Sequence, residues 1–448
     1  MYQSDWRTRL SAIGAHVSNA KPASADNGAG VFSSYQKFVV AILAFLQFTI
    51  VLDFMMLSPL GALVMPALKI GTSQFGLVVS TYAFSAGVSG FLTAGFADRF
   101  DRKKLLLFFY AGFLAGTLLC GLAATYPMLL LARMVTGLFA GVVGSVSFAI
   151  VTDLFPLQMR GRVMGLIQTA FAISTVLGIP LALLLSTHWG WNTPFFMVVA
   201  VATVVGVLIH TYMRPVTEHL KHHPDRSPLH HLLQTVSNPR YVQGFLTTGL
   251  LSVGGFMLMP FVSVFNVQNV GISLAQLPLM YMITGICSMV AGPLIGRASD
   301  AFGKLRVFAF GCAVTIVMVL IYTHLHTTPL WLLCVIMVIL QIGIFSRMIS
   351  ATALLSALPQ PADRGSYMSI SSSLQQVAGG VASVISGLIV VEAPSGDLLH
   401  FDVLGYVLVC TTLITLTMMY FINGKISGER GSQAGSPEPT PEPATVAE

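Results

Sequence analysis

The sequence predicts an all-α membrane protein whose twelve transmembrane helices form two pseudo-symmetric six-helix halves. Three observations lead to this fold class: the chain is very apolar, apolar runs of helix length recur along it, and a charged motif is repeated. Of its 448 residues, 55% are hydrophobic and only 9% are charged, and the mean hydropathy is +0.79. Soluble domains carry roughly 25% charged residues, so the composition excludes a soluble globular core.

Twelve apolar runs are each long enough to cross a hydrocarbon layer of about 30 Å. The first half, 36–212, contains the runs near 36–66, 73–97, 104–124, 127–153, 162–187 and 191–212. The second half, 240–423, contains the runs near 240–266, 276–299, 305–325, 329–357, 366–391 and 401–423. Three polar segments lie outside these runs. Residues 1–35 are expected to form a cytoplasmic tail without a signal peptide, and residues 213–239 a cytoplasmic central loop. Residues 424–448 are expected to form a disordered cytoplasmic tail.

The positions of Lys and Arg predict the orientation in the membrane. If the amino terminus is inside, the cytoplasmic loops are basic and the opposite loops contain Lys69 as their one basic residue. The excess of Lys and Arg on cytoplasmic loops is the usual determinant of topology. We therefore expect both termini in the cytoplasm. The net charge of +6 is explained by these basic loops, so we expect no nucleic-acid partner.

A charged motif between the second and third runs recurs in the second half. The first copy reads FLTAGFADRFDRKKLLL over 91–107, and the second reads PLIGRASDAFGKLRV over 293–307. Asp98 and Asp300 hold the same position in the two copies, 202 residues apart. Two parallel six-helix halves are typical of a transporter whose site lies between them near the membrane midplane and is exposed to each side in turn.

With these features the chain resembles the major facilitator superfamily of transporters, over about 36–423. The signature of that superfamily between its second and third helices reads Gly-x-x-x-Asp-Arg-x-Gly-Arg-Lys. Four residues match it: Asp98, Arg99, Arg102 and Lys103. Ala94 and Asp101 stand at its two glycines, and an aspartate at a glycine position is expected to add steric cost and charge to the turn. LDFMMLSPLG at 52–61 and LARMVTG at 131–137 also resemble the drug:proton antiporter and sugar efflux branch.

The resemblance implies a secondary active transporter that exports a small organic compound, such as a drug, sugar or metabolite, in exchange for protons. A proton-coupled or facilitative importer has the same fold and is the alternative, and a membrane enzyme or receptor is a more distant one. We expect no enzyme activity and no cofactor, with the proton gradient as the energy source. The expected partners are the substrate, protons and the lipid bilayer, and the chain is expected to be a monomer in a bacterial inner (plasma) membrane.

Asp53 is the one acidic residue that lies well inside an apolar run. A carboxylate at that depth costs several kcal/mol unless it is protonated or paired, so we expect Asp53 to carry protons; a static ion pair is the alternative. Arg133 matches the fourth-helix arginine of the family, which faces the central cavity. It could pair with Asp53 until the substrate or a conformational change separates them, which would couple the two flows.

Other polar and aromatic residues inside the apolar runs are candidates for the substrate cavity: Tyr82, Gln168, Asn266, Tyr281, Arg347, Gln375 and Gln376. For Arg347 two interpretations stay open. It binds an anionic or hydroxyl-bearing substrate, or its long side chain extends to the inner surface. The five His residues between 219 and 231 are interpreted as part of a solvated linker, and no metal site is expected.

Charged residues at the cytoplasmic helix ends are candidates for a gate: Asp98, Arg99, Arg102, Lys103, Asp153, Arg160, Arg162, Asp300, Lys304 and Arg364. Asp98 ends the second helix, where a carboxylate is unfavourable against the helix dipole, and could face the start of the eleventh helix near Arg364. Arg102 could pair with Asp153. Such a latch would hold the halves together while the site faces outward; the alternative is that these residues only determine topology.

Overall fold

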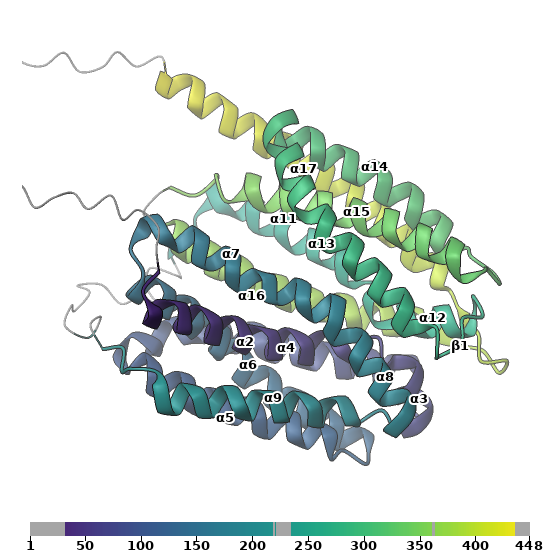
Figure 1. Ribbon diagram of the computed structural model, residues 1–448. Helices are drawn as coiled ribbons and strands as arrows, with labels where there is room; N and C mark the ends of the chain where they lie inside the picture. Colours follow the sequence, from purple (N-terminus) through teal and green to yellow (C-terminus); the bar gives the residue numbers. More distant parts are fainter. Residues whose placement is uncertain (1–31, 218–219, 221–233, 361–362, 435–448) are drawn as a thin grey trace, which may run out of the picture.

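The computed structural model describes residues 32–217, 220, 234–360 and 363–434. They form a bundle of long helices that run side by side (Figure 1). The described chain begins and ends at one end of the bundle, which we call the terminal end. The opposite end holds the one sheet of the described residues, a hairpin of β1 (Val391–Glu392) and β2 (Leu398–Leu399).

The apolar runs predicted from the sequence form the helices. The elements of the first half are α2 (Ser34–Met56), α3 (Gly61–Leu68), α4 (Thr72–Phe96), η1 (Ala97–Arg99), α5 (Arg102–Gly121), α6 (Tyr126–Leu154), α7 (Leu157–Ile173), η2 (Ser174–Gly178), α8 (Ile179–Trp189) and α9 (Thr193–Tyr212). Those of the second half are α11 (Pro239–Phe256), η4 (Met259–Phe261), α12 (Val262–Gln268), α13 (Leu277–Phe302), α14 (Lys304–Thr323), α15 (Leu330–Leu355), α16 (Arg364–Ile389) and α17 (Phe401–Ala434).

Within the described part of the chain, eleven helical segments are long and apolar enough to cross a membrane. The helix that forms in the predicted eleventh run, α16, has 26 residues, a length of about 39 Å at 1.5 Å per residue. Its first half is rich in Ser and Gln, which makes it more polar than the others. The all-α membrane architecture is therefore confirmed, and the count of twelve spans stays a prediction.

The last helix is longer than expected. α17 continues to Ala434, so the boundary predicted at residue 424 lies inside a helix. Gly424, Gly428 and Gly431 lower helix propensity in this stretch but keep their backbone donors. The first residue after Phe401 that removes a donor is Pro437, which explains why the helix does not stop earlier.

Two broken helices correspond between the halves. Pro59 lies in the break between α2 and α3, and Pro260 lies in the break between α11 and α12. These prolines are 201 residues apart, close to the separation of 202 residues for Asp98 and Asp300. Because proline has no N–H and its ring blocks the preceding turn, both helices break at equivalent positions.

Serine hydroxyls join the two breaks to each other. The Ser58 hydroxyl donates a hydrogen bond to the carbonyl of Met259. The Ser263 hydroxyl donates to the carbonyl of Ser58 at 2.9 Å. Carbonyl groups at the two breaks thereby hold the first half against the second at the opposite end.

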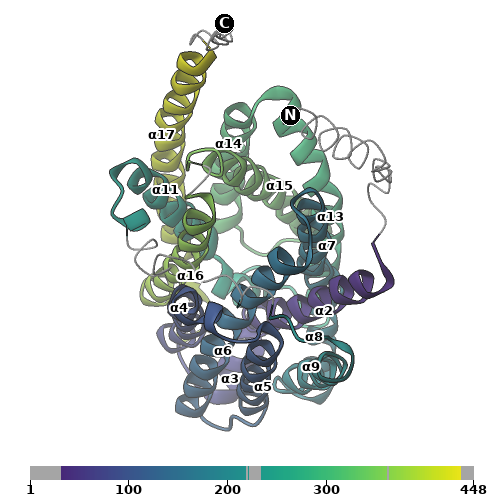
Figure 2. The same ribbon diagram turned by 90° about the vertical axis from the view of Figure 1, so that its left-hand side faces the viewer.

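The buried apolar side chains form two clusters, and only one of them contains buried residues of both halves. The larger cluster of buried apolar side chains includes both halves, with Leu57, Val64, Phe261 and Val264 among its members. The buried members of the smaller cluster, such as Tyr241, come only from the second half. Figure 2, viewed from the terminal end, shows α4, α5, α6 and α9 on one side and α11, α14, α15 and α17 on the other. The halves thus share a core mainly at the opposite end.

Candidate functional site

Asp53 of α2 and Arg133 of α6 form an ion pair inside the first half. Arg133 Nη1 lies 2.8 Å from Asp53 Oδ2 and also donates to the Asp53 carbonyl oxygen at 3.3 Å. Both side chains are completely buried. Because isolated charges are costly at this depth, each group is the counter-ion that the other requires. The pairing expected for these two residues is present.

The pair leaves several hydrogen-bonding positions unused. Asp53 Oδ1 and Arg133 Nε and Nη2 are buried without a hydrogen-bond partner in the described part of the chain. Tyr82 of α4 packs against the guanidinium, whose Cζ lies 4.3 Å from the ring centroid, and the Tyr82 hydroxyl is also unpartnered. The buried hydroxyl of Thr117 in α5 faces the Asp53 carboxylate without forming a hydrogen bond of normal geometry. Since buried polar groups normally have partners, this cluster can accept a proton, water or a polar ligand group.

A row of aromatic rings connects this cluster to the second half. The Phe54 ring lies 5.2 Å from the Tyr82 ring and 6.0 Å from the ring of Phe256 in α11, centroid to centroid. Phe54 follows Asp53 directly in the chain, so the ion pair lies next to the boundary between the halves. Broken helices at corresponding positions of two repeats indicate a binding site in such folds. The breaks lie close to these residues in the sequence, because Pro59 is six residues after Asp53 and Pro260 is four residues after Phe256.

Arg347 of α15 is buried inside the second half, with 3% of its surface exposed. The alternative in which its side chain reaches the inner surface is therefore wrong. Arg347 Nε and Nη2 have no hydrogen-bond partner among the described residues, and the thiol of Cys312 is a close neighbour. Arg347 Nη2 lies 3.7 Å from the point that a Cβ atom on Gly254 of α11 would occupy.

The other candidates for the substrate cavity are dispersed. The Asn266 amide is fully buried and already bonded within the second half, because its Oδ1 accepts from the Tyr322 hydroxyl at 3.0 Å and its Nδ2 lies 3.4 Å from Met280 Sδ. Three residues are partly buried, in α13 and α16: Tyr281, Gln375 and Gln376. Gln168 lies in α7, and its side chain is outside the described residues. Among the candidates whose side chains the structure describes, Tyr82 is thus the one that contacts the Asp53–Arg133 pair.

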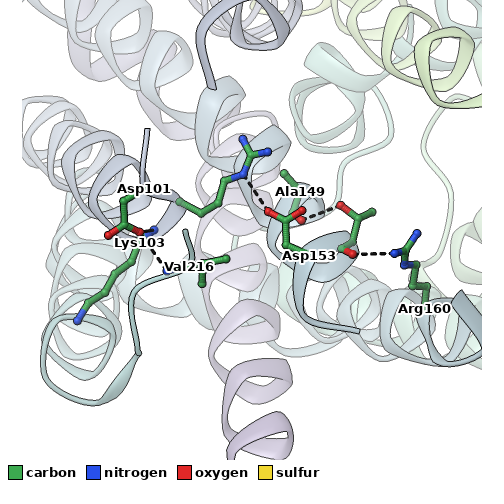
Figure 3. A network of polar contacts seen from close by, with 8 residues as sticks. Asp101, Lys103, Ala149, Asp153, Arg160 and Val216 are labelled. Carbon is green, nitrogen blue, oxygen red and sulfur yellow. Dashed lines mark hydrogen bonds and ion pairs between the residues drawn. The ribbon is translucent and has the colours of Figure 1, made fainter. Parts of the chain in front are cut away.

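At the terminal end, the structure brings three of the predicted gate residues together (Figure 3). Arg102 Nε lies 3.1 Å from Asp153 Oδ2 at the end of α6. Arg160 donates to the carbonyls of Phe155 and Thr152 at 2.9 and 2.7 Å. An arginine at the carboxyl end of a helix satisfies free carbonyl groups and the helix dipole. The expected Arg102–Asp153 pair is present, and Arg160 stabilises the same helix end.

Asp101, the departure from the family signature, fits its turn well. Its φ is −58°, so the steric cost expected for a side chain at this glycine position does not arise. Asp101 Oδ1 accepts from the backbone N–H of Lys103 at 2.9 Å and of Val216 at 3.1 Å. It therefore caps α5, as Asp favours at helix starts, and ties the chain that follows α9 to this turn. Figure 3 shows both contacts.

Several of the remaining gate candidates contact other parts of the described chain. Lys103 Nζ donates to the His210 carbonyl at 2.9 Å, and Lys304 Nζ lies 3.5 Å from the carbonyl of Ala353. The Arg162 guanidinium lies 4.9 Å from the Phe32 ring centroid. Two candidates, in the two copies of the charged motif, are exposed: Arg99 and Asp300. The side chains of Asp98 and Arg364 lie outside the described residues, as does every His between 219 and 231.

The packing of α4 against α16 bears on the latch. Thr72 donates to the Val390 carbonyl at 2.6 Å, and a Cβ atom on Gly76 would lie only 3.1 Å from Gly387 Cα. A Cβ atom on Gly90, further along α4, would lie 3.6 Å from Ser373 Oγ. The helices are antiparallel, and this register, continued, places the end of α4 near the start of α16. The Asp98 latch stays a prediction.

Several residues of the site were not predicted from the sequence. Thr117 and Gly254 carry no distinctive motif, and from the sequence the rings of Phe54 and Phe256 could either line an apolar cavity or pack between helices. The Phe54–Phe256 separation of 202 residues, equal to that of Asp98 and Asp300, is the signal that would have found this pair. No group of three or more potential metal ligands occurs in the ranges that the structure describes.

The sequence is similar to those of several known transporters. The chain is 27% identical to the MFS-type transporter YceJ of Bacillus subtilis over 59% of this chain and 67% of that protein. It is 25% identical to the multidrug resistance protein MdtG of Klebsiella pneumoniae, over 72% and 78% of the two chains. It is 24% identical to a probable sugar efflux transporter of Helicobacter acinonychis, over 62% and 70%. Other matches cover as little as 29% of the relative.

Solved structures give the same fold. A structure of the nucleoside transporter NupG has a TM-score of 0.70 at 14% identity and covers 86% of this chain and 99% of that one. The family model described as Major Facilitator Superfamily matches residues 43–383 and 244–447. Members of this family are integral membrane transporters and not enzymes. On the matched sequence, the shared fold and the repeated halves, the chain belongs to the Major Facilitator Superfamily.

Proposed function

We propose that this protein is a proton-coupled efflux transporter, which exports a small organic compound such as a drug, sugar or metabolite in exchange for protons. The observation that carries the proposal is the buried Asp53–Arg133 pair, 2.8 Å apart, inside the first half and next to its boundary with the second. A carboxylate in this position can be neutralised in two ways, by its arginine or by a proton. The multidrug and sugar efflux relatives support export.

The proposed coupling is a competition for Asp53. Protonation of Asp53 removes the charge that holds Arg133, and the guanidinium is then free to bond the Tyr82 hydroxyl, in a state that does not bind the substrate. Loss of the proton restores the ion pair. Because a ligand shifts a conformational equilibrium only by its differential affinity for the two states, proton binding and substrate binding at this cluster favour different states and are exchanged.

Alternating access requires closure at each end in turn. The Ser58–Ser263 contacts and the shared core supply closure at the opposite end. At the terminal end, the proposed gate comprises the Arg102–Asp153 pair and an Asp98 latch against the start of α16. In this scheme the terminal end is cytoplasmic, the protein acts as a monomer in a bacterial inner membrane, and no cofactor besides the proton gradient is needed.

The test is transport in inverted membrane vesicles with an imposed pH gradient. A panel of fluorescent compounds with different charges is offered to vesicles that contain the wild type, Asp53→Asn or Glu392→Gln. Glu392 is an exposed carboxylate at the opposite end, so its variant is the matched control. Wild type and control are expected to accumulate a panel compound against its gradient, whereas Asp53→Asn is expected to equilibrate it without accumulation.

Full accumulation by Asp53→Asn would show that Asp53 is not the proton carrier. The same vesicles distinguish export from import. An antiporter accumulates the compound as protons leave the vesicle, and a symporter moves compound and protons in the same direction. Accumulation only in the symport direction would overturn efflux in favour of import.

A further inference from the structure

The region around Asp53 has a counterpart in the second half that lacks a carboxylate. Pro59 and Pro260 are related by 201 residues, and Phe54 and Phe256 by 202 residues. The first separation aligns Asp53 with Gly254, and the second aligns it with Gly255. Where the first half has its buried acid, the second half therefore has a glycine pair with no side chain.

An arginine reaches this glycine pair from the equivalent helix. In the first half, Arg133 extends from the fourth span, α6, to Asp53 in the first span, α2. In the second half, Arg347 extends from α15, the fourth span of that half, toward α11, its first span. Arg347 Nη2 lies 3.7 Å from the Cβ position of Gly254. Each half thus directs a guanidinium from its fourth span toward its first span, and only the first half supplies an acid there. Arg347 stands 214 residues after Arg133, so the two arginines lie in equivalent helices but not at equivalent positions.

The surroundings of Arg347 do not neutralise it. The side chain is 3% exposed, and no acidic partner of Arg347 occurs in the described residues. Its neighbours are the thiol of Cys312 and, across Gly254, the hydroxyl of Thr411. A buried guanidinium normally has a counter-charge, and Arg is well suited to bind a carboxylate through two parallel hydrogen bonds.

We propose that Arg347 binds a compact anionic group at the Gly254–Gly255 position, where the first half holds the Asp53 carboxylate. This inference rests on the proposed function, because we assign the group to the transported molecule, which is therefore an organic anion. Phe256 follows the glycine pair directly in the chain, and its ring lies 6.0 Å from the Phe54 ring, centroid to centroid. These rings favour a flat apolar body next to the anionic group. A small free anion such as chloride has the same chemistry and is the second source.

Electrostatic balance supports the assignment. The Asp53–Arg133 pair is neutral, so Arg347 contributes an unbalanced positive charge to the interior of the bundle. An anionic ligand group cancels this charge, a neutral one leaves it in place, and a cationic one adds to it. Since charge interactions are strengthened in a low-dielectric environment, selection should depend more on the ligand's charge than on its shape.

The test is equilibrium binding to the purified protein in lipid nanodiscs, without any pH gradient and in a chloride-free, carboxylate-free HEPES buffer of low ionic strength. Three dansyl probes share one aromatic body: dansylglycine is anionic, dansylglycinamide is neutral and dansylcadaverine is cationic. Wild type is expected to bind dansylglycine about tenfold more tightly than the amide, which is the effect of one good charged hydrogen bond. Arg347→Gln is expected to bind both equally, and Arg347→Lys to keep part of the preference.

A second variant keeps the charge of Arg347 and fills part of the space at Gly254 that the anionic group would occupy. Gly254→Ala puts a methyl group 3.0 Å from Thr411 Oγ1 and 3.7 Å from Arg347 Nη2, so it should weaken dansylglycine binding and leave the amide unchanged. Gly249→Ala, on the same helix with nothing within 4 Å, is the matched control. Thermal unfolding of each variant identifies any that has failed to fold.

The outcomes separate the two sources and the two proposals. If chloride raises the unfolding temperature of wild type but not of Arg347→Gln, and the three probes bind alike, the anion is free and not part of the substrate. An undiminished dansylglycine preference in Arg347→Gln, or tightest binding of the cationic probe by wild type without a chloride effect, overturns the proposal. Because binding is measured without a gradient, failure of proton coupling at Asp53 would leave this result unchanged.

Discussion

The two halves of this transporter repeat a backbone but not its chemistry. In the first half a buried arginine is neutralised by Asp53 at 2.8 Å. In the second half a buried arginine faces Gly254, and no acid of the described chain pairs with it. In a duplicated scaffold, equivalent helices can thus each carry a buried arginine, at different positions and with different partners. The comparison suggests a division of labour, with the proton handled in one half and the substrate charge in the other.

The largest expected effect comes from disrupting the Asp53–Arg133 ion pair of the first half. Arg133→Met removes the counter-ion of Asp53, and loss of one partner of a buried pair typically costs about 3–5 kcal/mol. We expect a corresponding loss in the free energy of unfolding, measured by denaturant titration in detergent. The double variant Arg133→Met with Asp53→Asn should recover most of it, because no charge is then left without a partner. A single variant as stable as wild type would contradict a structural role for the pair.

The turns that follow the second span of each half provide a second comparison. Asp101 has φ −58°, whereas Gly303, 202 residues later, has φ +95°. A side chain at positive φ is strained by about 1–3 kcal/mol, so Gly303→Ala should lower the free energy of unfolding by that amount. Gly296→Ala, in α13 with nothing within 4 Å, is the control. Equal stabilities would show that the second turn can take the conformation of the first.

A smaller effect, of about tenfold in binding, is expected when the second half is given an acid at the position that corresponds to Asp53. Gly254→Asp introduces the acid that the second half lacks, next to the Arg347 guanidinium. The new carboxylate should pair with Arg347 and compete with an anionic ligand, so dansylglycine should lose its advantage of about tenfold over the amide. Binding assays in nanodiscs measure this ratio. If the ratio stays at the wild-type value, the anionic group does not lie at Gly254.

The sequence was a good guide to some parts of the site and not to others. Asp53 and Arg133 could be singled out because ionisable residues inside apolar runs are rare and costly. Arg347 was identified for the same reason, but its surroundings were not predictable: whether a long side chain reaches the surface or stays inside depends on the helices packed around it. The cost expected at Asp101 was wrong because a signature glycine does not require a positive φ in every member.

Much was therefore determined by the sequence alone: the membrane class, the approximate helix positions and the two-fold repeat. These follow from local properties, namely the apolar length that a bilayer requires, the placement of proline and the spacing of repeated residues. Only the tertiary structure decided which groups meet. Asp53 and Arg133 are 80 residues apart, and Arg347 and Gly254 are 93 apart. Such contacts depend on how helices pack and rotate, and no local pattern encodes that packing.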